Sequence, residues 1–157
     1  MISHLNKKNS PKIVDISNKK KSKRLAIAEG IINFSESTFK KIKSLKTKKG
    51  NIENLAIIAG VLGAKKTSEL IPLCHNIEIE DIDINIETMN KLKSLKIIAS
   101  VKSEGKTGVE MEALTAVQIS LLTIYDMCKS IDKGMVISEI KLELKKGGAS
   151  GEWKRSK

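Results

Sequence analysis

The sequence predicts an α+β fold with an antiparallel sheet and helices on one face of it. Three observations lead to this prediction. The spacing of apolar residues gives the order strand, two helices, two strands, long helix, strand. The two central strands follow each other closely enough to form a hairpin. The 157-residue chain, with 40% hydrophobic residues, suits one domain with a substantial core.

Residues 1–12 are polar and include Pro11, so we expect a flexible N-terminal tail followed by a single domain over residues 13–157. Residues 25–32 (LAIAEGII) are rich in apolar side chains and predict the first strand. The basic run at 18–24 has two interpretations, a solvated loop or a set of phosphate contacts.

Two helices are predicted next. Ser35 or Ser37 caps a short helix, and residues 52–64 form a second helix whose alanines and glycines allow close packing. Residues 47–51 form a loop between them. Lys65 follows the second helix, where the helix dipole alone favours a cation.

The two central strands come after a turn. Pro72 restricts the residue before it to an extended conformation, so residues 73–75 (LCH) enter the next strand from a turn. Isoleucines alternate with polar residues over 77–86, and a slip in phase at 80–81 indicates a β-bulge. Residues 95–101 form the partner strand of the hairpin.

The segment 106–129 has helical spacing of its apolar residues. No charged residue lies between Glu112 and Asp126, in a chain that is 30% charged, so this helix is buried along most of its sides. Along one helix these two carboxylates are about 21 Å apart, too far for one small substrate. The alternatives are a core helix with solvated ends, two sites per chain, or one site shared between subunits; for catalytic ends we favour the shared site.

Residues 140–144 alternate apolar and charged side chains in a last strand, ahead of a Gly-rich basic tail at 145–151. The paired glycines of the tail fit either a backbone nest for phosphate or a flexible end. The order of the elements is that of the ferredoxin-like β-α-β-β-α-β fold with an inserted helix. An apolar outer face of the sheet would require a partner, and oligomerisation is the usual solution.

Composition narrows the function. The net charge of +11 indicates an anionic partner, unless the lysines only solvate the surface. Two cysteines form neither a disulfide framework nor a zinc cluster, which fits a reducing cytoplasm. No segment is predicted to span a membrane or to act as a signal peptide. Aromatic residues make up only 3% of the chain, which argues against base stacking with nucleic acid.

No phosphate-loop, dinucleotide-binding, nucleophile-elbow or zinc-protease motif is present. His75 is a candidate acid–base group, although a histidine beside a strand is more often structural. Cys74 would point to the opposite face of that strand, so we do not expect it to act together with His75. Lys49 beside Gly50 could bring an ammonium to an anion, or could be an ordinary surface lysine. The residues alone indicate acid–base work on a phosphorylated compound by an oligomeric α+β domain.

Four segments resemble the cyclic pyranopterin monophosphate synthases, the MoaC family of molybdenum cofactor biosynthesis: KKTSELIPLCH (65–75), GKTGVEMEALTA (105–116), LTIYDMCK (122–129) and GGASG (147–151). The resemblance implies a ferredoxin-like homohexamer, a trimer of dimers, with active sites at the dimer interface. It implies a cytoplasmic enzyme with no nucleic-acid or membrane partner. No cofactor is expected beyond Mg²⁺ that could accompany a substrate triphosphate.

The resemblance also implies the reaction. A lyase would convert (8S)-3′,8-cyclo-7,8-dihydroguanosine 5′-triphosphate to cyclic pyranopterin monophosphate and diphosphate. A lysine near other cations has a lowered pKa and can act as acid or base. By resemblance, the catalytic residues are Lys49, Asp126 and Lys129, the pocket residues are Leu73, Cys74, His75, Glu110, Met111 and Glu112, and the triphosphate-binding residues are Arg24, Lys65 and Lys145.

Two other function classes fit the same residues. A phosphatase or cyclohydrolase acting on a guanine nucleotide would be distinguished by its dependence on a metal ion. A nucleic-acid-binding module on the sheet would show steep salt dependence of oligonucleotide binding.

Overall fold

The computed structural model describes residues 4–6, 8–42, 46–47 and 50–156, and of residues 46–47 and 50–51 the backbone alone. The elements are β1 (Ser22–Asn33), α1 (Glu36–Ile42), β2 (Lys46–Thr47), β3 (Gly50–Asn51), α2 (Ile52–Lys65), α3 (Thr67–Leu70), β4 (Asp81–Met89), η1 (Asn90–Leu92), β5 (Ser94–Gly105), α4 (Glu110–Cys128), β6 (Val136–Lys146) and β7 (Trp153–Lys154).

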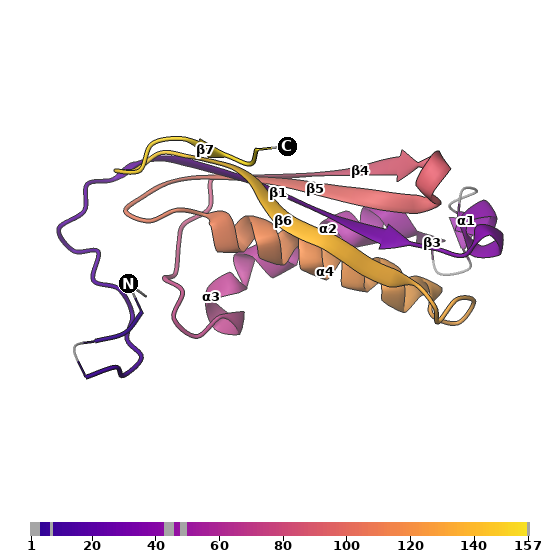
Figure 1. Ribbon diagram of the computed structural model, residues 1–157, viewed down its shortest axis with the longest axis horizontal. Helices are drawn as coiled ribbons and strands as arrows, with labels where there is room; N and C mark the ends of the chain where they lie inside the picture. The colour runs from indigo at the N-terminus through magenta and orange to yellow at the C-terminus, as the bar shows by residue number, and fades with distance from the viewer. Residues whose placement is uncertain (1–3, 7, 43–45, 48–49, 157) are drawn as a thin grey trace.

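The main sheet is antiparallel and five-stranded, in the order β4-β5-β1-β6-β7, and α2, α3 and α4 lie on one side of it (Figure 1). The four long strands and the helices between them follow the ferredoxin-like order, with α1 as an additional short helix. The predicted fold class is therefore confirmed. The Ser35 hydroxyl accepts a hydrogen bond from the Thr38 amide (3.3 Å), which confirms the predicted cap of α1.

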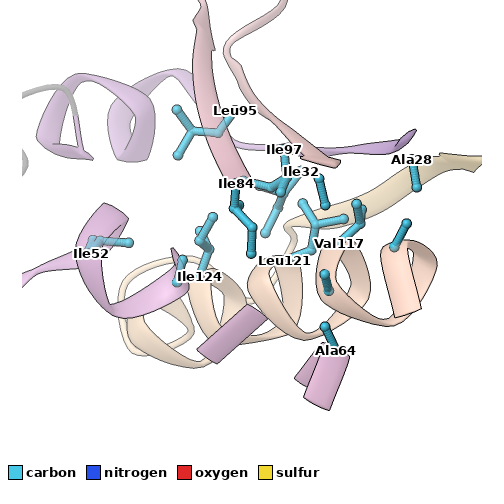
Figure 2. Packing of buried hydrophobic residues seen from close by; sticks show 14 of the residues in the cluster. Ala28, Ile32, Ile52, Ala64, Ile84, Leu95, Ile97, Val117, Leu121 and Ile124 are labelled. Atoms are coloured by element: carbon cyan, nitrogen blue, oxygen red, sulfur yellow. The ribbon is translucent and has the colours of Figure 1, made fainter. Parts of the chain in front are cut away.

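The core lies between the sheet and the helices (Figure 2). Ile32 of β1 and Ile97 of β5 face Leu121 and Ile124 of α4, and all four side chains are fully buried. Each such side chain contributes roughly 2 kcal/mol of hydrophobic free energy relative to an exposed position. The charge-free middle of α4 therefore serves the core, as its sequence indicates.

The contact between α2 and α4 depends on small residues. The Ser120 hydroxyl of α4 donates a buried hydrogen bond to the Ala56 carbonyl of α2 (2.9 Å). A Cβ atom at Gly60 would lie 2.6 Å from Ile84 Cδ1 and 3.0 Å from the Ala116 carbonyl oxygen. The alanine–glycine pattern of α2 thus sets the distance between the two helices.

We expect Gly60→Ala to destabilise the protein by about 1–3 kcal/mol, because the added methyl group would force the two helices apart. The higher helix propensity of alanine offsets up to about 1 kcal/mol of this cost. The free energy of unfolding from urea denaturation measures the effect. Gly134→Ala is the matched control, since its Cβ would meet only Asp132 Oδ1 at 3.4 Å. Equal stabilities of the two variants would contradict the expected clash.

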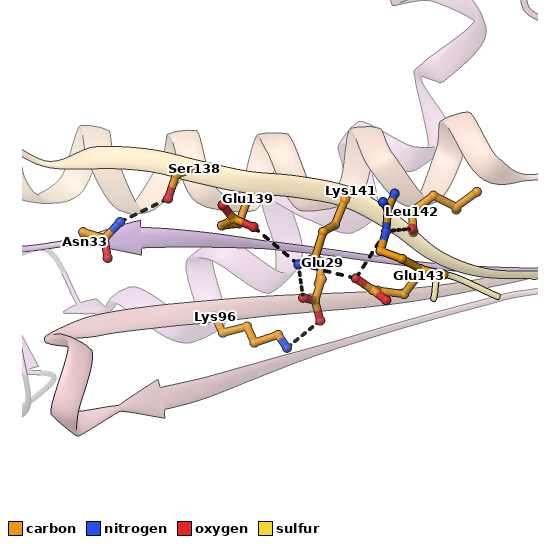
Figure 3. Close-up of polar contacts among 9 residues, drawn as sticks. Glu29, Asn33, Lys96, Ser138, Glu139, Lys141, Leu142 and Glu143 are labelled. Atoms are coloured by element: carbon orange, nitrogen blue, oxygen red, sulfur yellow. Dashed lines mark hydrogen bonds and ion pairs between the residues drawn. The ribbon is translucent and has the colours of Figure 1, made fainter. Parts of the chain in front are cut away.

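The face of the sheet that the helices leave open carries an ion-pair network (Figure 3). One carboxylate oxygen of Glu29 in β1 forms an ion pair with Lys96 of β5, and the other forms an ion pair with Lys141 of β6 (3.3 Å). Partial burial acts to raise the pKa of Glu29, but the two lysines lower it overall. The half-buried Ile27 and Ile98 flank this network, so the open face is mixed rather than apolar.

Some element boundaries differ from those predicted. Residues 77–80 precede β4 instead of forming its first half, because pairing with β5 begins at Asp81 opposite Lys102. The change in phase at 80–81 is therefore a strand start and not a bulge. The loop predicted at 47–51 overlaps the short strands β2 and β3, which pair with each other. Lys48 and Lys49 lie outside the described residues.

The N-terminal segment makes defined contacts where it is described. The Lys12 amide donates to the His4 carbonyl (2.9 Å), and Leu5 forms a β-bridge with Pro11. Flexibility of residues 1–12 and the single domain over 13–157 stay predictions. Along the described part of the chain, no helix has both the length and the apolar character needed to cross a membrane.

Candidate active site

The segment after α3 forms a turn because Pro72 prevents the helix from continuing. The Cys74 amide donates to the Ile71 carbonyl (3.0 Å) and closes this turn. Cys74 and His75 lie outside any strand, and both line the same cavity. The prediction that they point to opposite faces is therefore wrong, because it assumed strand geometry where the chain turns.

This cavity has a volume of about 280 Å³, and we call it the acidic pocket. The N-terminal end of α4 supplies Glu110, Met111 and Glu112, and the turn after α3 supplies the apolar Leu73. The remaining lining residues are His4, Cys74, His75, Ile77, Thr107 and Gly108. The structure therefore brings together all six pocket residues that the sequence resemblance implied.

Glu112 has the most perturbed carboxyl group of the pocket. It is only 3% exposed, and this burial, with the charge of Glu110 nearby, raises its pKa to about 7. Burial and the Glu112 charge also raise the pKa of the Cys74 thiol. A carboxyl that titrates near neutral pH can both donate and accept a proton, as acid–base catalysis requires.

A second cavity of about 600 Å³, the basic pocket, lies next to the acidic one. Arg24, Lys106 and Lys145 line it, together with Lys19 and Lys20 of the basic run. This geometry therefore favours phosphate contacts, rather than a solvated loop, as the role of the basic run at 18–24. The two pockets share Thr107, Gly108 and Glu110, so they are adjacent and form the cationic and the acidic lobe of one candidate site.

The wall between the lobes is held by side chains of both. Lys145 donates to Glu110 Oε1 (3.0 Å), and Arg24 Nε donates to the Gly105 carbonyl (3.2 Å). The Arg24 guanidinium lies against Gly148, whose φ of +77° only glycine adopts readily and whose Cβ position the guanidinium fills. The Gly147 amide donates to the Gly151 carbonyl (3.1 Å), so it serves the turn and not a phosphate nest.

Asp126 and Lys129 form an ion pair (2.6 Å) at the opposite end of α4. Their side chains are 60% and 58% exposed, and they line a shallow depression with Leu122 and Tyr125. The hydrogen bond from Lys129 to Asp126 raises the pKa of that lysine. Among the described residues, Asp126 thus acts in the opposite direction to neighbouring cations, which would lower the pKa of a lysine.

Figure 1 shows that the elements carrying the expected site residues lie at two ends of the molecule. The N-terminal segment, α3 and the start of α4 gather at one end, whereas α1, β3 and the end of α4 lie at the other. Lys65 is exposed and lines neither the acidic pocket, the basic pocket nor the depression at Asp126. Lys49, the third expected catalytic residue, lies outside the described part of the chain.

Sequence reasoning gave no site role to several lining residues with polar side chains, of which Lys106 and His4 can carry a charge. Lys106 was passed over because it precedes the helix, and His4 because the tail offered no periodic pattern. Neither has a local signal, since each reaches the site only through the packing of distant segments.

The amino-acid sequence matches the model of the MoaC family over residues 13–148. The chain belongs to this family. A protein of Campylobacter jejuni (strain RM1221) named "Cyclic pyranopterin monophosphate synthase" is 52% identical over 155 residues, covering 99% of both chains. A protein of the same name from Helicobacter pylori (strain Shi470) is 50% identical over 156 residues, again covering 99% of both. The predicted family is therefore confirmed. The names of these relatives also confirm the prediction that this chain is an enzyme.

Proposed function

We propose that this MoaC-family chain converts (8S)-3′,8-cyclo-7,8-dihydroguanosine 5′-triphosphate to cyclic pyranopterin monophosphate and diphosphate. The observation that carries the proposal is the pair of adjacent pockets, one lined by cations and the other by carboxyl groups. A nucleoside triphosphate has the same polarity, with an anionic chain at one end and a base rich in N–H groups at the other. The names of the relatives support the same product.

In this proposal the basic pocket binds the triphosphate through Arg24, Lys106 and Lys145. The carboxyl groups of Glu110 and Glu112 accept hydrogen bonds from the N–H groups of the base. A hydroxyl of the sugar attacks the α-phosphorus and closes the cyclic phosphate, and the bond to the β-phosphate breaks. The cations stabilise the negative charge that develops on the departing diphosphate.

Rearrangement of the base requires proton transfers. Lys129, whose pKa is raised by Asp126, is a proton donor at neutral pH, and the carboxylate of Asp126 accepts a proton. Within one chain this pair lies about 21 Å along α4 from Glu112, so it must come from a second subunit to reach the same substrate. We therefore place the active site between two subunits.

The outer surface of the helices supports such an interface. Leu55, Ile58 and Leu62 of α2 and Leu122 of α4 are 40–57% exposed, and Leu122 borders the Asp126–Lys129 pair. Apolar side chains gathered on neighbouring helices mark an association surface. We propose the homohexamer of three dimers, located in the cytoplasm, that the family resemblance implies. The proposal includes no cofactor of the protein's own; Mg²⁺ would enter only with the triphosphate.

A turnover assay tests the proposed function. The purified protein receives the cyclo-dihydro-GTP intermediate, and diphosphate and oxidised fluorescent pterin are followed. We expect Lys49→Ala and Lys129→Ala to lower kcat at least about 100-fold, the usual effect of removing an acid–base group. Lys154→Ala, an exposed change on β7, is the control. Absence of turnover in folded native protein would exclude the reaction. Metal-dependent release of phosphate from GTP, with no formation of the pterin from the intermediate, would favour the hydrolase alternative.

A further inference from the structure

His4 lies in the wall of the acidic pocket, although every other lining residue is at least 69 positions away in the sequence. The described part of the chain offers no hydrogen-bond partner to either of its ring nitrogens, and Nδ1 is buried. The buried Nδ1 is costly as an unsatisfied donor or as an unsatisfied acceptor, and its burial keeps a ligand in the pocket from pairing with it. We therefore assign the proton to Nε2, which makes this atom a hydrogen-bond donor.

The backbone at His4 is held by a local turn. The His4 carbonyl accepts the Lys12 amide (2.9 Å), and the Asn6 side-chain oxygen accepts the amides of Lys8 (2.8 Å) and Ser10 (3.0 Å). These bonds close the segment on itself around the Leu5–Pro11 bridge. The position of His4 is thus set by its own segment and not by an unsupported chain end.

The N-terminal strap also forms hydrogen bonds with both lobes of the site. We use this name for residues 4–6 and 8–17. His75 Nε2 of the acidic pocket donates to the Val14 carbonyl (2.7 Å). Lys106 Nζ of the basic pocket donates to the Ser17 carbonyl (2.7 Å). In Figure 1 the strap runs along the end of the molecule where α3 and the start of α4 lie. It therefore forms part of the site wall.

We propose that His4 is a substrate-binding residue whose Nε2–H donates a hydrogen bond to the carbonyl oxygen of the guanine-derived base. The inference rests on the proposed function, because it assigns one further contact to the same substrate. When they are ionised, Glu110 and Glu112 act only as hydrogen-bond acceptors, for the N–H groups of the base. The adjacent carbonyl oxygen of the base therefore requires a donor from another residue. The N–H of His75 is already bound to Val14. Of the two imidazoles in this pocket, that of His4 is the one with no hydrogen-bond partner among the described residues, so it can donate to the substrate.

Substitutions of similar size separate this contact from a structural role. We expect His4→Leu, which removes the donor, to raise KM about 5- to 10-fold with little change in kcat, as loss of one neutral hydrogen bond in both ground and transition states does. His4→Gln, which keeps an N–H donor, should stay within about 3-fold of native. Lys8→Ala, an exposed change in the same strap, should have no effect. Unchanged KM in His4→Leu, or equal losses in both His4 variants, would overturn the assignment.

The chain has only two histidines, which makes a direct binding measurement possible. In protein labelled with ¹⁵N at histidine, His4→Gln identifies the ring signals of His4. We expect addition of GTP, which carries the same triphosphate and a guanine base, to shift the signals of both histidines. A shift at His75 alone would overturn the role of His4 and leave the proposed function intact. No shift at either histidine, with no turnover, would remove both proposals.

Discussion

Glu112→Gln and Asp126→Asn should each abolish turnover, and mixed oligomers of the two variants should recover about a quarter of native activity. Each change keeps the size of the side chain but removes a carboxylate. Glutamine at position 112 would present an N–H group to the N–H donors of the base, and asparagine at 126 could not accept a proton. We expect losses of about 100-fold or more from each single variant.

The recovery follows from the geometry of α4. If each site combines Glu112 of one subunit with Asp126 of another, a mixed dimer has one doubly altered site and one native site. Random mixing at equal amounts makes about half of the dimers mixed, so about a quarter of all sites are native. A site contained within one chain would recover nothing, since every chain would carry a defect.

The experiment requires complete exchange of subunits. The two variants, with tags of different mass, are unfolded and refolded together, and native mass spectrometry verifies the mixed species. Each variant refolded alone gives the baseline, and refolded native protein gives full activity. Turnover at the baseline level despite verified exchange would show that Glu112 and Asp126 do not serve one shared site.

Glu112→Gln should also change how stability depends on pH. The pKa of about 7 in the folded protein lies above the usual value of 4.5, so between these values the folded chain holds a proton that the unfolded chain has released. The stabilisation is complete below about pH 4.5, and it is lost as the pH rises through 7. At 1.36 kcal/mol per pKa unit, the loss is on the order of 3 kcal/mol.

Neighbouring groups make a difference measurement necessary. Glu110, Cys74, His75 and His4 line the same pocket, and Lys145 is paired with Glu110. Free energies of unfolding for native protein and Glu112→Gln, measured from pH 5 to 8 at one protein concentration, cancel the contributions the two proteins share. The variant should gain stability relative to native protein as the pH rises. Glu104→Gln, at an exposed carboxylate of β5, is the control. Parallel curves for Glu112→Gln and native protein would show that burial does not raise this pKa.

Elements with strong local patterns could be predicted from the amino-acid sequence alone. The helix predicted within the segment 106–129 is observed as Glu110–Cys128, and the one predicted at 52–64 as Ile52–Lys65. Helical periodicity and caps act within a few residues, so the sequence contains them. The separation of Glu112 and Asp126 is of the same kind, because a helix has a fixed rise per residue. The expectation of a shared site therefore needed no tertiary structure.

Tertiary structure decided what depends on partners distant in the chain. β4 starts at Asp81 because pairing with β5 begins there. The alternating isoleucines before Asp81 do not indicate this start. The two adjacent pockets join the N-terminal strap, the turn after α3, the start of α4 and the end of β6. The place of His4 in that wall and the burial that raises the pKa of Glu112 both arise from this packing. Burial and electrostatic neighbours are properties of the folded chain, and no local pattern specifies them.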